Sequence, residues 1–154
     1  MPEKRYYLTK QGLQKIEQEL DTLKSKKQDL LNGTGPRAFR FGEIEAEYIA
    51  FREDLRRVEE KIFELENVLE NYGLIEEPAK KERDKVHLGA KVLVEIDGQL
   101  DEFLIVGTLE ADPAMGKISN ESPVGKALIG RKAGEQIIIN SPTNIKYTIK
   151  KIRY

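Results

Sequence analysis

Apolar residues recur at alternating steps of three and four along the first half of the chain, in two stretches separated by a loop. The first stretch comprises Leu13, Ile16, Leu20, Leu23 and Leu30, with Lys27 where one apolar residue is missing. The second comprises Ile44, Tyr48, Phe51, Leu55, Val58, Ile62, Leu65 and Leu69, without a gap. This alternation is typical of helices that pack as a left-handed coiled coil.

Capping signals predict where these two helices begin and end. The first is predicted to run from just after Thr9, a reasonable N-cap, to about Leu31, where Asn32-Gly33 supplies a C-cap signal. The second is predicted to run from near Gly42-Glu43 to about Tyr72. Because the connection is short, the helices are expected to pack antiparallel within one chain. Two ordinary helices of a bundle, or a coiled coil between chains, are the alternatives.

The second half of the chain changes to strand-like patterns. Strands are predicted at residues 91–96, 100–106, 136–139 and 146–152. Asp97-Gly98 is a strong hairpin signal between the first two strands. Ser122-Pro123 has the form of an N-cap followed by a first-turn proline, which predicts a short helix that stops at Gly130. These elements predict a small domain with an antiparallel sheet and one short helix.

The fold class is therefore α+β, with an all-helical part followed by a mixed part. Residues 1–75 are expected to form a coiled-coil finger whose tip lies at about residues 32–45. Residues 76–85 are a polar linker, and residues 86–154 form the sheet domain. A chain of 154 residues is long enough for two small domains of this kind.

Composition excludes several classes of function. The chain has 26 Lys and Arg against 27 Asp and Glu, a formal net charge of −1, so any electrostatic targeting of a partner must be local. It has no cysteine, which excludes disulfides and cysteine-based metal sites. It also lacks a signal-peptide core and any apolar run near the ~20 residues of a membrane helix. A cytoplasmic protein without membrane contacts is expected.

Two groups of residues resemble the bacterial GreA/GreB transcript-cleavage factors, and the resemblance covers essentially the whole chain. In the first half it rests on Tyr7-Leu8-Thr9 before the helix start Gly12-Leu13, and on Ala46-Glu47-Tyr48, Ala50 and Arg52-Glu53. In the second half it rests on the more specific stretch 118–130, which contains the Ser-Pro helix start, and on Lys132 and Gly134. The resemblance implies an N-terminal antiparallel coiled coil and a C-terminal FKBP-like domain.

The resemblance also implies a partner and a mode of action. In that family the globular domain docks on RNA polymerase, and the finger enters the secondary channel toward the 3′ end of backtracked RNA. Two acidic residues at the tip help to hold a second Mg²⁺, a hard cation that suits carboxylate oxygens. The polymerase performs the hydrolysis, so the resemblance implies a monomeric accessory factor rather than an enzyme. Its only cofactor would be the Mg²⁺ that it shares with the polymerase.

The tip departs from the family pattern. The family reads Gly-Asp-Leu-x-Glu-Asn before Ala-Glu-Tyr. Aligned without gaps on Ala46-Glu47-Tyr48, this chain has Phe41 and Ile44 where the two acids belong. An alignment with two residues deleted instead assigns the acids to Glu43 and Glu45.

The conformation at the tip decides which carboxylates can act together. If the second helix has begun at Glu43, that residue shares a face with Glu47 rather than Glu45. If the segment is extended, successive side chains alternate between the two sides of the strand instead. Acids in a first helical turn are also favoured by the helix dipole alone. The sequence therefore leaves open a second function, a Gre-like protein that occupies the channel without stimulating cleavage and so inhibits or modulates transcription.

Two further sets of site residues are predicted. The candidates for contact with RNA phosphates are the basic residues Arg37, Arg40, Arg52 and Arg56, although arginines on a solvated helix face with ion-pair partners would have the same pattern. The resemblance places docking on the polymerase at Asn120, Glu121, Ser122 and Pro123. A prolyl isomerase and a coiled-coil scaffold unrelated to polymerase are weaker alternatives.

Overall fold

The computed structural model describes residues 5–33, 39–40, 43–44, 46–140 and 143–154, with only the backbone at 39–40 and 43–44. Its contacts divide the chain into two compact units. One comprises Leu13–Asn71, and the other combines Met1–Gly12 with Tyr72–Tyr154. None of the helices in the described part of the chain has the length and apolar character that crossing a bilayer requires.

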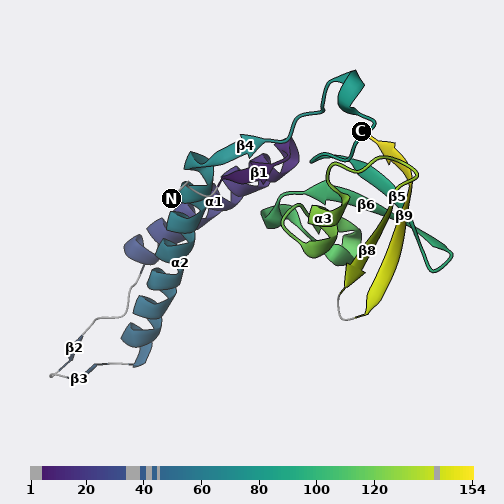
Figure 1. Ribbon diagram of the computed structural model, residues 1–154. Coiled ribbons are helices and arrows are strands. Elements are labelled where there is room, and N and C mark those ends of the chain that lie inside the picture. Colours follow the sequence, from purple (N-terminus) through teal and green to yellow (C-terminus); the bar gives the residue numbers. More distant parts are fainter. Residues whose placement is uncertain (1–4, 34–38, 41–42, 45, 141–142) are drawn as a thin grey trace. The chain divides into compact units, whose positions relative to one another are not determined.

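The helical unit is a hairpin of two long helices (Figure 1). Helix α1 spans Lys10–Asn32, which confirms the predicted start after Thr9, and helix α2 spans Ala46–Glu70. Ion pairs join Lys24 to Glu66 at 3.3 Å and Lys27 to Glu59 at 3.4 Å. Because the partner moves down α2 as the lysine moves up α1, the helices are antiparallel within one chain, as predicted.

The seam between the helices is best buried in the half away from the tip. Its buried residues are Ile16 and Leu20 on α1 and Val58, Ile62, Leu65 and Val68 on α2. Burial of each such side chain contributes about 1.5–3 kcal/mol. Leu30, Phe51 and Leu55, nearer the tip, are only half-buried. At the other end Val68 is buried whereas the predicted Leu69 is half-buried, because a helix of 3.6 residues per turn drifts from a strict heptad.

The second helix is shorter than predicted at both ends. It was expected to begin near Gly42-Glu43, but α2 begins at Ala46 because the preceding residues form strands. Strands β2 (Phe39–Arg40) and β3 (Glu43–Ile44) pair antiparallel, with Arg40 opposite Glu43. Two residues separate the strands, the length of the tightest β-hairpins.

The far end of α2 is followed by a strand that the sequence did not predict. Strand β4 (Tyr72–Leu74) pairs in parallel with β1 (Tyr6–Leu8), and the amide of Ile75 continues the ladder to the carbonyl of Leu8 at 2.8 Å. Leu8 is fully buried. Each strand has three residues, too few for a recognisable alternation of polar and apolar positions. The pair joins the segments that precede α1 and follow α2.

The other unit contains a five-stranded sheet with strand order β7-β6-β5-β9-β8. The four predicted strands are confirmed within two residues at each end, as β5 (Lys91–Ile96), β6 (Gln99–Val106), β8 (Gln136–Asn140) and β9 (Asn144–Arg153). The hairpin at Asp97-Gly98 is also confirmed, with φ of 50° and 79° at the two residues. The fifth strand, β7 (Lys117–Ser119), was not predicted and runs parallel to β6, so the sheet is antiparallel in all but one pair.

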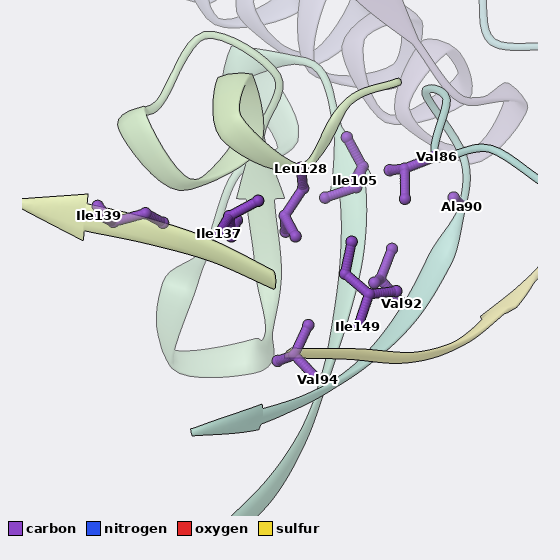
Figure 2. Close-up of a cluster of buried hydrophobic side chains, with 9 residues drawn as sticks. All are labelled: Val86, Ala90, Val92, Val94, Ile105, Leu128, Ile137, Ile139 and Ile149. Atoms are coloured by element: carbon purple, nitrogen blue, oxygen red, sulfur yellow. The ribbon is translucent and has the colours of Figure 1, made fainter. Parts of the chain in front are cut away.

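One face of this sheet carries the core of the unit. Figure 2 shows the nine buried side chains, which come from the sheet, the segment before it and the short helix α3 (Pro123–Leu128). They are Val86, Ala90, Val92, Val94, Ile105, Leu128, Ile137, Ile139 and Ile149. Leu128, in the last turn of α3, lies beside Ile105 and Ile137 (Figure 2). The strand alternation that predicted the sheet therefore also selects its buried face.

The predicted polar linker has local structure of its own. A 3₁₀ turn, η1, spans Lys80–Glu82. The Arg83 guanidinium follows it, donates to the carbonyl of Pro78 at 3.0 Å and pairs with Glu77 at 3.1 Å. These bonds hold the segment in a defined path before the sheet begins.

Candidate functional site

Of the three predicted tip acids, the structure describes the backbone of Glu43 and the whole of Glu47. Glu43 is in β3, so the backbone there is extended, the second of the two conformations considered for it. The structure describes only the backbone of Glu43 and Arg40. Arg37 and Glu45 lie outside the described residues. Glu47 is exposed in the first turn of α2. Within the described residues, no three His, Cys, Asp or Glu side chains are grouped to hold a metal ion.

Arg52 stands one helical turn beyond Tyr48 on α2. Its guanidinium carbon is 6.0 Å from the centre of the Tyr48 ring, at the outer limit of a cation–π contact. The side chain is exposed. An exposed arginine beside an aromatic ring can approach a phosphate while the ring meets a base, and contact of Arg52 with RNA stays a prediction.

Arg56 is instead engaged with two carboxylates of its own helix. Its guanidinium pairs with Glu60 at 2.7 Å and with Glu53 at 3.0 Å. The hydrogen bond from Arg56, and then its charge, lower the pKa of Glu53, and the same bond raises the pKa of Arg56. These pairs offset the charge of Arg56 locally and favour a structural role on a solvated helix face.

A groove of about 460 Å³ runs along this part of α2. The residues that line it are Tyr48, Ile49, Arg52, Glu53, Leu55, Arg56 and Glu59. Ile49 is 54% exposed and was not predicted as a site residue, because it lies off the heptad seam. An aromatic ring, an aliphatic side chain and a guanidinium on one surface suit a ligand with both a flat apolar part and a negative charge.

The predicted docking segment connects β7 to α3. Ser122 caps the helix, because its hydroxyl accepts a hydrogen bond from the amide of Gly125 at 3.0 Å and donates to the carbonyl of Ser119 at 2.7 Å. Pro123 is the first residue of α3 and is exposed. The predicted N-cap and first-turn proline are thus confirmed, and they present Pro123 at the surface.

A hydroxyl network fixes the other half of this segment. The Thr108 hydroxyl donates to the Glu121 carboxylate at 2.7 Å and lies 2.9 Å from the hydroxyl of Ser119. The Thr108 proton is used on Glu121, so the Ser119 hydroxyl donates to Thr108. Ser119, which is buried, also accepts from the amide of Glu121 at 3.0 Å. Thr108 was not predicted as a site residue, since no sequence motif connects it to Glu121.

Comparisons with known proteins identify the family of this chain. The family description "Transcription elongation factor, N-terminal" matches residues 6–73, and "Transcription elongation factor, GreA/GreB, C-term" matches residues 80–154. The chain belongs to the GreA/GreB family of transcription elongation factors. It is 43% identical to transcription elongation factor GreA of Clostridium acetobutylicum over 98% of each chain, and 44% identical to GreA of Acetivibrio thermocellus over 97% of each. The family resemblance and the α+β fold class predicted from the sequence are confirmed.

Solved structures of related proteins also match almost the whole chain. GreA factor homolog 1 of Thermus thermophilus is 23% identical and matches 98% of this chain and 100% of its own, with a TM-score of 0.43. The elongation factor GreA/GreB of Nitrosomonas europaea is 19% identical, covers 97% of this chain and 99% of its own, and has the same TM-score. A TM-score this low supports no conclusion about geometry or function.

Proposed function

We propose that this protein docks on RNA polymerase, extends its helical hairpin into the secondary channel and promotes cleavage of backtracked RNA. Family membership across both halves of the chain supports the partner. The observation that carries the proposal is the antiparallel pair of long helices α1 and α2, between which the chain forms the two-stranded pair β2–β3 that contains Glu43. A slender hairpin with acidic residues at its end suits delivery of carboxylates into a channel.

The residues at the tip indicate which part of the reaction this protein would support and which part the polymerase would perform. Glu43 and Glu45 would hold the Mg²⁺ that the factor shares with the polymerase, with Glu47 as the alternate ligand, because hard divalent cations prefer carboxylate oxygens. The bound ion would stabilise charge on the phosphodiester oxygens while the polymerase performs the hydrolysis. Arg37, Arg40 and Arg52 would contact the phosphates near the RNA 3′ end. The protein is thus an accessory factor that completes the catalytic site of another enzyme.

Docking is assigned to the segment from Asn120 to Pro123. The exposed Pro123 at the start of α3 offers a rigid apolar contact, and Glu121 beside it offers a charge. Both are held in place by the Ser122 cap and the Thr108 hydroxyl. A preorganised segment loses little conformational entropy on binding, which suits a docking site.

A second candidate function is occupancy of the channel without stimulation of cleavage. It is favoured by the late start of α2 at Ala46, which leaves Glu43 on a strand. Glu43 and Glu45 are also one residue closer in sequence than the family pair. Because Glu43 precedes the helix, it does not share with Glu47 the helical face that a spacing of four residues would otherwise give the two acids.

Transcript cleavage in a stalled, backtracked elongation complex distinguishes the two candidates. Purified polymerase is supplied with the wild-type protein or with Glu43→Gln, Glu45→Gln or Glu47→Gln. The first two substitutions are expected to lower stimulated cleavage by about 10- to 100-fold, the range typical for groups that support a metal site. Glu70→Gln, an exposed acid in the last turn of α2, is the matched control and should cleave like wild type.

Binding to polymerase is measured in parallel with cleavage. If the protein binds polymerase but produces no shortened RNA above the intrinsic rate, the first candidate function is wrong. That result would establish the second candidate. Pro123→Glu should weaken binding by about tenfold, since truncated or charged anchors at interfaces commonly cost more than 1 kcal/mol. Ala114→Glu, at an exposed position of a separate 3₁₀ turn, is its control.

A further inference from the structure

The first turn of α1 has no acidic side chain of its own, although a helix N-terminus favours negative charge. The missing carboxylate comes from Glu110, in the 3₁₀ turn η2 (Thr108–Glu110). Glu110 accepts from the amide of Thr9 at 2.8 Å and from the Thr9 hydroxyl at 2.5 Å. The Thr9 oxygen in turn accepts from the amide of Gly12 at 2.9 Å. All these residues belong to the same compact unit.

This arrangement reproduces a capping box with one member supplied from elsewhere in the chain. In a capping box, the third helical residue is a Glu or Gln that accepts from the backbone amide of the N-cap. Here the third helical residue is Gly12, and Glu110, 101 residues from Thr9, fills that role. A Cβ atom on Gly12 would lie 2.5 and 2.7 Å from the two Glu110 carboxylate oxygens. Glycine at this position therefore makes room for the distant carboxylate.

The other end of η2 is joined to the predicted docking segment. Thr108, two residues before Glu110, donates its hydroxyl proton to Glu121 at 2.7 Å. The neighbouring Ser119 hydroxyl reinforces the contact at 2.9 Å. The turn η2 thus contacts Glu121 through its first residue, Thr108, and the N-cap of α1 through its last residue, Glu110.

We propose that η2 couples docking to the finger, with Glu110 as a positioning residue that completes the N-cap of α1 and Thr108 as its link to Glu121. A polymerase contact that fixes Glu121 also fixes Thr108 and η2, and so strengthens the cap at the start of α1. Helix α1 continues without a break from this cap to Asn32, next to the tip segment. The coupling rests on the proposed docking at residues 120–123, whereas the cap itself does not.

Amide hydrogen exchange in the free protein tests the cap. Glu110→Ala should lower protection of the Thr9 and Gly12 amides by about tenfold, because a charge-assisted cap is lost. Gly12→Ala should have a similar effect by displacing the carboxylate, and Glu110→Gln, which keeps one acceptor, should restore part of the protection. Glu76→Ala, an exposed acid of the same unit, is the control. Unchanged exchange in Glu110→Ala overturns the cap and with it the coupling.

Measurements on the polymerase complex test the coupling. Binding should raise protection of the Thr9 and Gly12 amides in the wild type but not in Thr108→Val. At saturating factor, where a loss of affinity no longer limits the rate, Glu110→Ala and Thr108→Val should lower maximal cleavage by about threefold to tenfold. Pro123→Glu should do the opposite, weakening binding while maximal cleavage at saturation is retained.

The outcomes separate this inference from the proposed function. If the wild type binds polymerase without stimulating cleavage, the proposed cleavage fails and the exchange comparison still decides the coupling. If binding protects wild type and Thr108→Val equally, the coupling is overturned. If the protein does not bind polymerase, docking and coupling fail together, and the exchange of the free protein alone decides the cap.

Discussion

At the scale of single residues, Tyr154 shows how one hydroxyl can close a loop of backbone. Its oxygen accepts from the amide of His87 at 2.9 Å and its proton is donated to the carbonyl of Lys85 at 2.5 Å. The residue thereby joins the last strand to the segment that leads into the sheet. Removal of the hydroxyl would leave two backbone groups without this partner. Leaving such groups unpaired costs more stability than removing both members of a hydrogen bond.

Tyr154→Phe is expected to lower the free energy of unfolding by about 1–3 kcal/mol at neutral pH, the usual cost of groups left unpaired. Urea unfolding monitored by circular dichroism measures this change. Tyr7→Phe, at a ring that is 37% exposed, is the control and should cost less than about 0.5 kcal/mol. Equal stability of Tyr154→Phe and wild type would show that water replaces the hydroxyl without loss.

The same residue predicts a pH dependence. Burial raises the pKa of Tyr154 above its ordinary value, more than the bond from the His87 amide lowers it. Because the folded-state pKa is the higher one, the contribution of Tyr154 is fully present below the unfolded-state pKa of about 10 and is lost as pH rises through the folded-state pKa. The stability difference between wild type and Tyr154→Phe should therefore narrow above pH 10. A constant difference would contradict the assignment.

At the scale of elements, neighbouring residues of α2 test which face holds the finger together. Ile62 is 9% exposed in the seam, whereas the adjacent Phe63 is 74% exposed on the outer face. Ile62→Ala should destabilise the helical unit by about 2–4 kcal/mol through lost burial and a cavity. Phe63→Ala, the larger truncation, should cost less than about 0.5 kcal/mol. Hydrogen exchange of the α1 and α2 amides measures both losses of stability. A larger loss for Phe63→Ala than for Ile62→Ala would mean that a partner surface covers Phe63.

The long elements could be predicted from the sequence because each carries several turns or pleats of a periodic pattern. Helix α1 and strand β5 begin and end where caps and turn residues indicated. Strands β1, β4 and β7 have three residues each, too few for a period, and their pairing is parallel, which no local turn signal reveals. The same reason explains the missed tip hairpin, whose strands have two residues each.

The candidate site residues could likewise be predicted only where the signal is local in sequence. Ser122 and Pro123 could be placed because a cap motif is local in sequence. Thr108 and Glu110 could not, since their partners Glu121 and Thr9 lie 13 and 101 residues away and no spacing rule connects them. Contacts of that kind depend on how the 3₁₀ turn packs in the folded unit, a tertiary property.

At the scale of the whole molecule, the balance of charge and the distribution of acids bear on metal binding. The net charge of −1 provides no general attraction for cations. Two tip carboxylates alone supply far fewer ligands than Mg²⁺ requires, so most of its coordination sphere must come from water or from a partner. The metal is therefore expected to belong to the complex with polymerase rather than to the free protein.

Removal of Mg²⁺ should accordingly leave the free protein unchanged but stop its action. Exchanging about 10 mM MgCl₂ for EDTA should shift the melting temperature by less than about 1 °C, because a ligand stabilises a fold only when its concentration exceeds its dissociation constant. Stimulated RNA cleavage in the complex should disappear under the same exchange. A clear rise in melting temperature with Mg²⁺ in the wild type, absent from Glu43→Gln but present in Glu70→Gln, would instead show that the tip binds the ion by itself.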